Sequence, residues 1–130
     1  MNALMASCCF AAIVLPDSPT AVERTAADEL KAAVRRISGE EWQIVPEHAE
    51  PAGERNFHVG ATRAAARIAP AAWRADEILV APLPNGSIVL AGDPVRGPIY
   101  AVDTYLEDVC GVRWWTSAES DYPTLREMPP

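Results

Sequence analysis

Short apolar runs separated by turn residues predict most of the strands in this chain. Positions 8–15 are continuously apolar, which is typical of a strand buried on both faces of a sheet. In 41–46 and 56–60 apolar and polar positions alternate, as they do in a half-buried strand. Asn85-Gly86 lies between two apolar runs and predicts a hairpin, because both residues tolerate positive φ. The predicted strands are 8–15, 41–46, 56–60, 77–81, 87–91 and 112–115.

Apolar residues at helical spacing predict a long helix over 20–38. Its apolar stripe recurs every three or four positions, and the charged residues lie off the stripe. Ser18 is the expected N-cap, with Pro19 at the first helical position, and Gly39 is expected to end the helix. The stripe consists of Val22, Ala26, Leu30, Ala33 and Ile37.

A second, shorter helix is predicted to begin at Pro98, because proline fits the first helical turn. Gly111 suits a left-handed residue at its C-terminal end. Gly97 beside Arg96 indicates a close backbone approach, either to a neighbouring strand or to a ligand. The apolar face of this helix is expected to consist of Ile99, Val102, Leu106 and Val109.

The predicted elements follow the order strand, long helix, strand, strand, hairpin, helix, strand. Thr62 is expected to cap a short additional helix over 63–68. This order predicts an α/β (α+β) domain in which two main helices pack on one mixed β-sheet. The predicted boundaries are an N-terminal tail at 1–7, the domain at 8–123, and a C-terminal tail or linker at 124–130.

Bulk properties narrow the classes of function. The net charge of −7 argues against a nucleic-acid or anionic-membrane surface, because both need clustered positive charge. No run reaches the ~18 apolar residues that a membrane-spanning helix needs. The apolar N-terminus lacks a positively charged start, so we interpret 8–15 as a strand, with a degraded signal peptide as the alternative.

The three cysteines are Cys8, Cys9 and Cys110, and no CxxC motif is present. Adjacent side chains on a strand point to opposite faces, so Cys8 and Cys9 cannot easily share a metal ion. Buried reduced thiols are the preferred interpretation, and a disulfide from Cys110 to either of the others stays open.

Residues that commonly carry catalysis or bind metals are sparse. His48 in a predicted loop and His58 on a predicted strand have no ligand partners at close spacing. Alternation turns Phe57 and Val59 inward and His58 outward, and a structural or surface role is expected for each histidine. Adjacent carboxylates diverge and cannot share a site as acid and base, and Cys110 lacks an activating base. We therefore predict no catalytic, cofactor-binding or metal-binding residue in this chain, and no cofactor.

The pair Trp114-Trp115 is the feature that most resembles a binding surface. Alternation along a strand sends one ring to each face of the sheet. One ring is expected in the core, and the other at an interdomain contact or under a bound sugar. Arg96 and Tyr100 on the second helix complete the candidate contact set for a sugar or a neighbouring domain.

An ordered series of motifs covers most of the chain, from residue 10 to residue 123. In this order and spacing it resembles the N-terminal domain of α-glucuronidases, the similar accessory domain of β-hexosaminidases, and related bacterial hydrolase-like proteins. The series is Ile13-Val14-Leu15-Pro16, Thr25-Ala26-Ala27-Asp28-Glu29-Leu30, Ile37-Ser38-Gly39, His58-Val59-Gly60-Ala61-Thr62, Ile88-Val89-Leu90-Ala91-Gly92, Arg96-Gly97-Pro98-Ile99-Tyr100-Ala101-Val102, Tyr105-Leu106-Glu107 and Gly111-Val112-Arg113-Trp114-Trp115.

The resemblance implies a mixed sheet flanked by helices that precedes a (β/α)8 catalytic barrel of a glycoside hydrolase. It implies carbohydrate processing, often of plant or bacterial polysaccharide side chains. It also places the catalytic carboxylates in the barrel, which would follow Pro130, so it transfers no catalytic residue to this chain. Relatives that act on polysaccharides are often secreted or periplasmic.

Three interpretations of the function follow. The first is a non-catalytic accessory domain that packs against a catalytic barrel. The second is a stand-alone carbohydrate-binding module, which would use the adjacent tryptophans and Tyr100. The third is an enzyme that uses Arg96 with Asp93 or Glu107, and it is the weakest because no nucleophile–base pair is evident.

Overall fold

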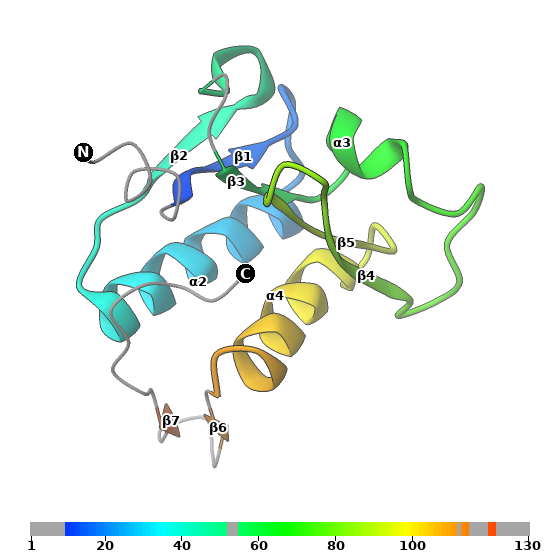
Figure 1. Ribbon diagram of the computed structural model, residues 1–130. Helices are drawn as coiled ribbons and strands as arrows, with labels where there is room; N and C mark the ends of the chain where they lie inside the picture. Colours follow the sequence, from blue (N-terminus) through cyan, green and yellow to red (C-terminus); the bar gives the residue numbers. More distant parts are fainter. Residues whose placement is uncertain (1–9, 52–54, 112, 115–119, 122–130) are drawn as a thin grey trace.

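The computed structural model describes residues 10–51, 55–111, 113–114 and 120–121 (Figure 1). Its strands are β1 (Phe10–Leu15), β2 (Gln43–Pro46), β3 (Arg55–Val59), β4 (Ile78–Pro82), β5 (Ile88–Gly92), β6 (Arg113–Trp114) and β7 (Ser120–Asp121). Its helices are α2 (Ala21–Ser38), α3 (Arg63–Ala66) and α4 (Gly97–Asp108), with a short 3-10 turn, η1, at Glu47–Ala49.

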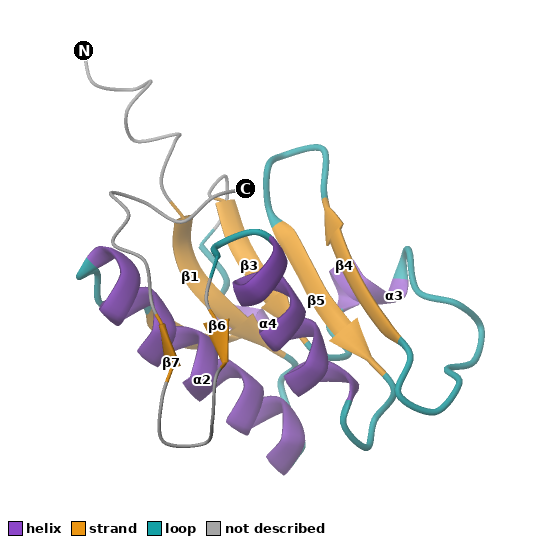
Figure 2. Ribbon diagram, turned by 90° about the horizontal axis from the view of Figure 1, so that it is seen from below, coloured by secondary structure: helices purple, strands orange, loops and turns teal. Residues whose placement is uncertain are grey.

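Five strands form a mixed sheet in the order β2-β1-β3-β5-β4, and Figure 2 shows β1, β3, β5 and β4 side by side. β1 pairs in parallel with β2 and β3, and β3 pairs in parallel with β5, whereas β4 is antiparallel to β5. The register places Ile13 of β1 beside Ile44 of β2 and Phe57 of β3. The predicted α/β class with one mixed sheet and two main helices is confirmed.

The path of the chain across the sheet reverses at β1. From β1 the chain passes through α2 to β2 on one side, and it then returns past β1 to β3 on the other side. In open α/β sheets, ligands usually bind outside the carboxyl ends of the two strands that flank such a reversal. In this domain that position lies at the ends of β1 and β3, next to the start of α2.

The main core lies between the sheet and the two long helices, α2 and α4, which cover the same face (Figure 2). Ile13, Phe57 and Leu90 face these helices from three neighbouring strands. The ring of Phe57 lies 5.3 Å from the ring of Trp42 and 5.1 Å from that of Tyr105, the second contact being edge-on. Such aromatic contacts add to the free energy gained by burying the rings.

The opposite face of the sheet carries a smaller apolar cluster under α3. Ala65 of α3 packs there against Val89 of β5. His58 lies beside Val89 in the register of β3 and β5, whereas Phe57 and Val59 belong to the main core. The predicted alternation is therefore confirmed. His58 is nevertheless only 4% exposed, because it is covered on this second face.

The start of α2 differs from the prediction by two residues. The N-cap is Thr20, not Ser18, because Thr20 and Glu23 satisfy each other's backbone N–H groups. The Thr20 hydroxyl accepts the N–H of Glu23 at 3.1 Å, and the Glu23 carboxylate accepts the N–H of Thr20 at 2.9 Å. This capping box fixes the helix start beyond Pro19. Gly39 ends the helix with a φ of 80°, as predicted.

The predicted second helix is present as α4, and Ile99, Val102 and Leu106 lie on its core side as predicted, whereas Val109 does not. Tyr105 is 1% exposed and lies in the core, whereas Val109 is 40% exposed. The helix ends at Asp108, so Val109 lies beyond its last turn. Gly111 has the predicted left-handed backbone, with a φ of 82°, although Val109 is the C-cap.

The predicted hairpin is present as β4 and β5, but its turn and the last predicted strand differ from the prediction. In the hairpin between β4 and β5, Gly86 has a φ of 90° and donates its N–H to the carbonyl of Leu83 at 2.9 Å, whereas Asn85 has a negative φ. Of the predicted strand 112–115, the structure describes Arg113–Trp114, which form β6 and are not part of the main sheet. β6 instead pairs antiparallel with β7 in a separate two-stranded sheet. Cys8, Cys9 and the predicted terminal tails lie outside the described residues.

The start of α4 lies directly against the end of β5. Gly92 is the last residue of β5 and Gly97 is the first residue of α4, and a Cβ atom on either would collide with the backbone of the other. The close backbone approach predicted for Gly97 is therefore an approach to a strand. This contact fixes the position of α4 over the sheet.

We predict that Gly97→Ala destabilises the domain by about 3 kcal/mol, because the new methyl group meets backbone that cannot rotate away. Gly39→Ala is the matched control, since a Cβ there meets nothing within 4 Å. Its left-handed φ alone is expected to cost about 1 kcal/mol. Urea unfolding of both variants checks the difference, and equal losses would contradict a tight contact between β5 and α4.

Candidate functional site

The carboxyl edge of the parallel strands, where this type of sheet usually holds its ligand, is filled by the chain's own carboxylates. Three backbone N–H groups at this edge each donate to an acidic side chain. The contacts are Ala61 to Glu23 at 2.7 Å, Arg63 to Glu47 at 2.7 Å, and His48 to Asp17 at 3.0 Å. In other proteins, free backbone N–H groups at such an edge donate hydrogen bonds to phosphates and other anions. Here they are already paired, so the edge is not an open anion site.

Asp17 and His48 form a surface contact that ties η1 to the end of β1. His48 Nδ1 lies 2.9 Å from Asp17 Oδ1, and both side chains are exposed. The hydrogen bonds that the backbone and ring of His48 direct at Asp17 lower the pKa of this carboxyl. His48 therefore has the surface role expected for it.

The predicted contact residues Arg96 and Tyr100 come together at the start of α4. Arg96 Nη1 donates to the Tyr100 hydroxyl oxygen at 3.4 Å, and Arg96 Nε lies 3.9 Å from Asp76 Oδ1. The hydrogen bond to Tyr100, followed by the charge of Asp76, raises the pKa of Arg96. The side chains of the other two predicted residues, Trp114 and Trp115, lie outside the described part of the chain.

A cleft of about 410 Å³ opens beside Arg96. Trp73 and Asp76 line it together with Arg96 and Asp93. Asp93 is 5% exposed, and its Oδ1 accepts the N–H of Val95 at 2.9 Å and that of Arg96 at 3.4 Å, so this carboxylate shapes the loop before α4. An aromatic side chain beside a few charged groups is a common composition for a small-ligand site.

Sequence reasoning did not single out Trp73 or Asp76. For Trp73, the available signal was an isolated aromatic residue in a polar, proline-containing segment. For Asp76, it was the residue type, because aspartate tolerates the left-handed backbone region, and Asp76 lies there with a φ of 61°. The third interpretation paired Arg96 with Asp93 or Glu107. Asp93 is committed to the loop, and Glu107 lies about three helical turns from Arg96, so the structure brings together no acid–base pair from these residues.

Cys110 is a buried, free thiol, as expected. Burial raises its pKa to about 11, and the hydrogen bond with Tyr105 offsets this only in part. A thiol with a raised pKa is a weak nucleophile at neutral pH. Within the described part of the chain, no three His, Cys, Asp or Glu side chains gather closely enough to hold a metal ion.

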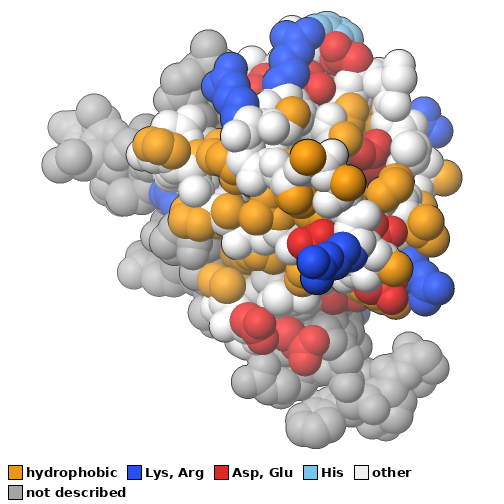
Figure 3. Space-filling model, turned by 90° about the vertical axis from the view of Figure 1, so that its right-hand side faces the viewer, with side chains coloured by type: hydrophobic (Ala, Val, Ile, Leu, Met, Phe, Trp, Pro, Cys, Tyr) orange, Lys and Arg blue, Asp and Glu red, His pale blue; other side chains and the backbone are white. Residues whose placement is uncertain are grey.

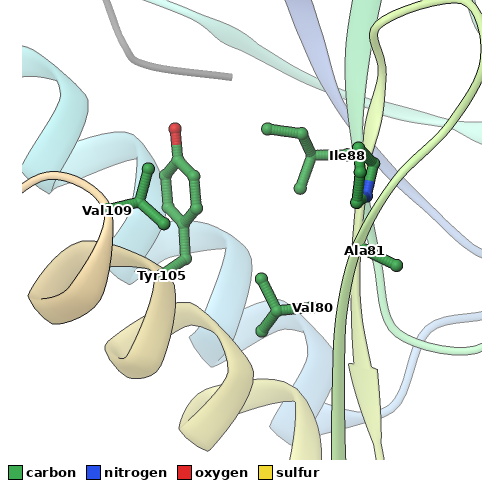
Figure 4. Close-up of a pocket in the computed structure, with 6 residues that line it drawn as sticks. Val80, Ala81, Ile88, Tyr105 and Val109 are labelled. Carbon is green, nitrogen blue, oxygen red and sulfur yellow. The ribbon is translucent and has the colours of Figure 1, made fainter.

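An apolar hollow of about 180 Å³ lies between β4, the edge strand of the sheet, and the C-terminal end of α4 (Figure 4). Tyr105 and Val109 of α4 face Val80 and Ile88 across it. Most side chains of β4 are only partly buried, and an edge strand also has unpaired backbone groups. This side of the domain therefore combines exposed apolar area with an open strand edge.

Glu29 of α2 and Asp103 of α4 form a carboxyl pair between the two core helices. Partial burial, and then the hydrogen bond and charge of Asp103, raise the pKa of Glu29 to about 8. The raised pKa keeps the Glu29 carboxyl mostly protonated at neutral pH. Sequence reasoning considered only carboxylates that are adjacent in the chain, so it missed a pair that the packing of two helices creates. Neither residue lines the clefts described above.

Comparisons with known proteins give no family assignment. No protein-family model matches this chain, and no curated protein matches it. None of the helices in the described residues has the length and apolar character that crossing a membrane requires.

We predict that Glu29 contributes a loss of stability as pH rises from about 4.5 to about 8, because the folded state holds a proton on this carboxyl group that the unfolded chain releases. Glu29→Gln removes this loss and is expected to stabilise the domain at pH 8 by about 1–2 kcal/mol, after allowance for solvent screening. At pH 4 it is expected to change little. Urea unfolding at both pH values checks this, with Asp28→Asn on the same helix as the charge control. A gain at pH 8 that Asp28→Asn reproduces would contradict the pairing.

Proposed function

We propose that this chain is a non-catalytic accessory domain of a carbohydrate-active enzyme of the α-glucuronidase or β-hexosaminidase type. In this proposal it packs against a catalytic (β/α)8 barrel through the side formed by β4 and the C-terminal end of α4. The observation that carries the proposal is the apolar hollow beside the edge strand. The motif series from residue 10 to residue 123 supplies the carbohydrate context.

The hollow has the properties of a docking surface. Its lining is almost entirely apolar, and Val109 at its rim is 40% exposed. Filling it with one aliphatic or aromatic side chain from a neighbouring domain would gain about 1.5–3 kcal/mol from burial. The half-exposed side chains of β4 extend the same surface along the edge of the sheet. Interfaces have an apolar centre of this kind surrounded by polar groups.

The chemistry of the described residues supports the non-catalytic part of the proposal. The groups that could act as nucleophile or base are each engaged in structural contacts. Asp93 holds a loop, His58 contacts a carboxylate, and Cys110 is protonated at neutral pH. A glycosidase needs two carboxyl groups facing each other across a sugar-sized gap, and the Glu29–Asp103 pair is in direct contact instead.

The test begins with the coding sequence that follows Pro130. We predict that it encodes a barrel, and that the protein containing both parts protects the backbone amides of 78–81 and 105–109 from hydrogen exchange more than the domain alone does. Val109→Glu should weaken this protection and leave the isolated domain within about 0.5 kcal/mol of its native stability. Val95→Glu, at a similarly exposed apolar position beside the other cleft, is the control. A following sequence without a barrel, or equal effects of the two variants, would contradict the proposal.

The cleft beside Arg96 favours a second candidate, a carbohydrate-binding module. Trp73 offers an aromatic surface, and Asp76 and Arg96 offer groups that can hydrogen-bond to sugar hydroxyls. Arg96 and Tyr100 belong to the contact set predicted from the sequence. That set named Trp114 and Trp115, whereas the tryptophan that lines this cleft is Trp73.

Calorimetric titration with neutral xylo- and gluco-oligosaccharides tests this second candidate. It predicts binding with a Kd on the order of 1 mM, and Trp73→Ala is expected to raise this Kd at least about tenfold. Trp42→Ala is not a suitable control because Trp42 is in the core, so Val109→Glu serves instead. Absence of binding, or binding that Trp73→Ala leaves unchanged, would rule out this cleft as a sugar site.

A further inference from the structure

A third cleft, of about 320 Å³, lies on the second face of the sheet, opposite the two long helices. Residues of η1 and its flank line it on one side, α3 lines it on another, and the turn between β4 and β5 contributes the rest. At the top of Figure 3, where α3 and η1 lie, basic and acidic side chains gather next to one another. The lining residues are Glu47, Glu50, His58, Arg63, Ala64, Arg67, Leu83 and Asn85.

The polar groups on β3 hold one wall of this cleft in place. His58 Nε2 lies 3.3 Å from Glu50 Oε2, and the same oxygen accepts a hydrogen bond from Asn56 Nδ2 at 3.0 Å. Burial lowers the pKa of His58, although the charges of Glu50 and Glu47 oppose the change, so the imidazole is neutral at pH 7 and donates through Nε2. This arrangement leaves Oε1 of Glu50 without a partner among the described residues.

The opposite charges that line the cleft do not pair with one another. Arg63 is the first residue of α3 and Arg67, one turn later, is its C-cap, and both are exposed. Among the described residues, neither guanidinium forms an ion pair with a carboxylate, although Glu47 and Glu50 line the same cleft. Glu47 accepts the N–H of Arg63 through Oε2, which leaves its Oε1 without a hydrogen bond from Arg63. The cleft thus presents two cations and two carboxylate oxygens that a bound molecule could join.

The arrangement of charges selects the class of ligand. Two guanidinium groups favour a carboxylate or a phosphate. Glu47 and Glu50 favour hydroxyl donors and repel a second negative charge, which disfavours phosphate. The mainly polar lining disfavours an apolar ligand. A molecule with one carboxylate and several hydroxyl groups satisfies both sets of groups at once.

We propose that this cleft binds a small polyhydroxy carboxylate. The carboxylate of the ligand lies on Arg63 and Arg67, and its hydroxyl groups donate to Glu47 and Glu50 and accept from the amide of Asn85. His58 acts as a positioning residue that holds Glu50. A buried Nδ1 on His58 that has no hydrogen-bond partner among the described residues is costly for a purely structural histidine, which supports a ligand site at this place. The site is separate from the docking surface and from the cleft beside Arg96.

The test is an NMR titration of the whole chain with gluconate as the probe, compared with sorbitol, hexanoate and inorganic phosphate. Sorbitol has the hydroxyl groups without the carboxylate, and hexanoate has the carboxylate without the hydroxyl groups. We expect gluconate to shift the amide resonances of 63–67 and the ring resonances of His58 with a Kd on the order of 1 mM. Each of the other three probes should bind at least about tenfold more weakly, because it satisfies only one set of groups.

Two substitutions complete the test. Arg67→Gln should weaken gluconate binding at least about tenfold and leave the fold unchanged, since this side chain is exposed and makes no ion pair among the described residues. Arg24→Gln on α2, an exposed arginine of the other layer, should have no effect. The proposal is overturned if gluconate gives no saturable shift, if hexanoate, sorbitol or phosphate binds as well, or if the two variants behave alike.

Discussion

The buried carboxylate of Glu23 is the interaction on which the arrangement of this domain depends. It accepts the N–H of Thr20 at 2.9 Å and that of Ala61 at 2.7 Å, so a single side chain caps α2 and fastens it to the loop after β3. At this point the chain reverses its path across the sheet, and related architectures use it to bind an anion. Because carboxylates of the chain itself accept the N–H groups at this edge, an anion does not bind to those N–H groups.

Three other surfaces of the described residues differ from one another in their chemistry. The hollow between β4 and α4 is apolar, the cleft beside Arg96 adds an aromatic ring to charged groups, and the cleft over His58 is lined by opposite charges that do not pair. An apolar edge suits a neighbouring domain, whereas the two polar clefts suit small hydroxylated molecules. This division of roles is compatible with a domain that supports a catalytic neighbour and itself contributes binding rather than bond cleavage.

The sequence predicted what depends on local periodicity and left out what depends on tertiary contact. The stripe of α2 and the alternation around Phe57 were sufficient for the class of fold, because burial repeats with the period of each element. The start of α2 was predicted at Ser18 instead of Thr20, although Thr20 and Glu23 have the sequence pattern of a capping box. Arg96 and Tyr100 were named as candidate contacts from the sequence, and the start of α4 brings their side chains together. Trp73 and Asp76 were missed because they reach the cleft beside Arg96 only when residues 73–76 pack near the loop that precedes α4.

The most direct test of this account asks whether the carboxyl edge of the sheet is closed. A titration of the chain with ADP and with phosphate can be followed at the backbone amides of His48, Ala61 and Arg63, which donate to Asp17, Glu23 and Glu47. The account predicts that the His48 and Ala61 resonances do not move and that the Ala61 amide exchanges slowly with solvent. A saturable shift of all three amides would show instead that the edge is an open anion site, and the function would then have to be sought there.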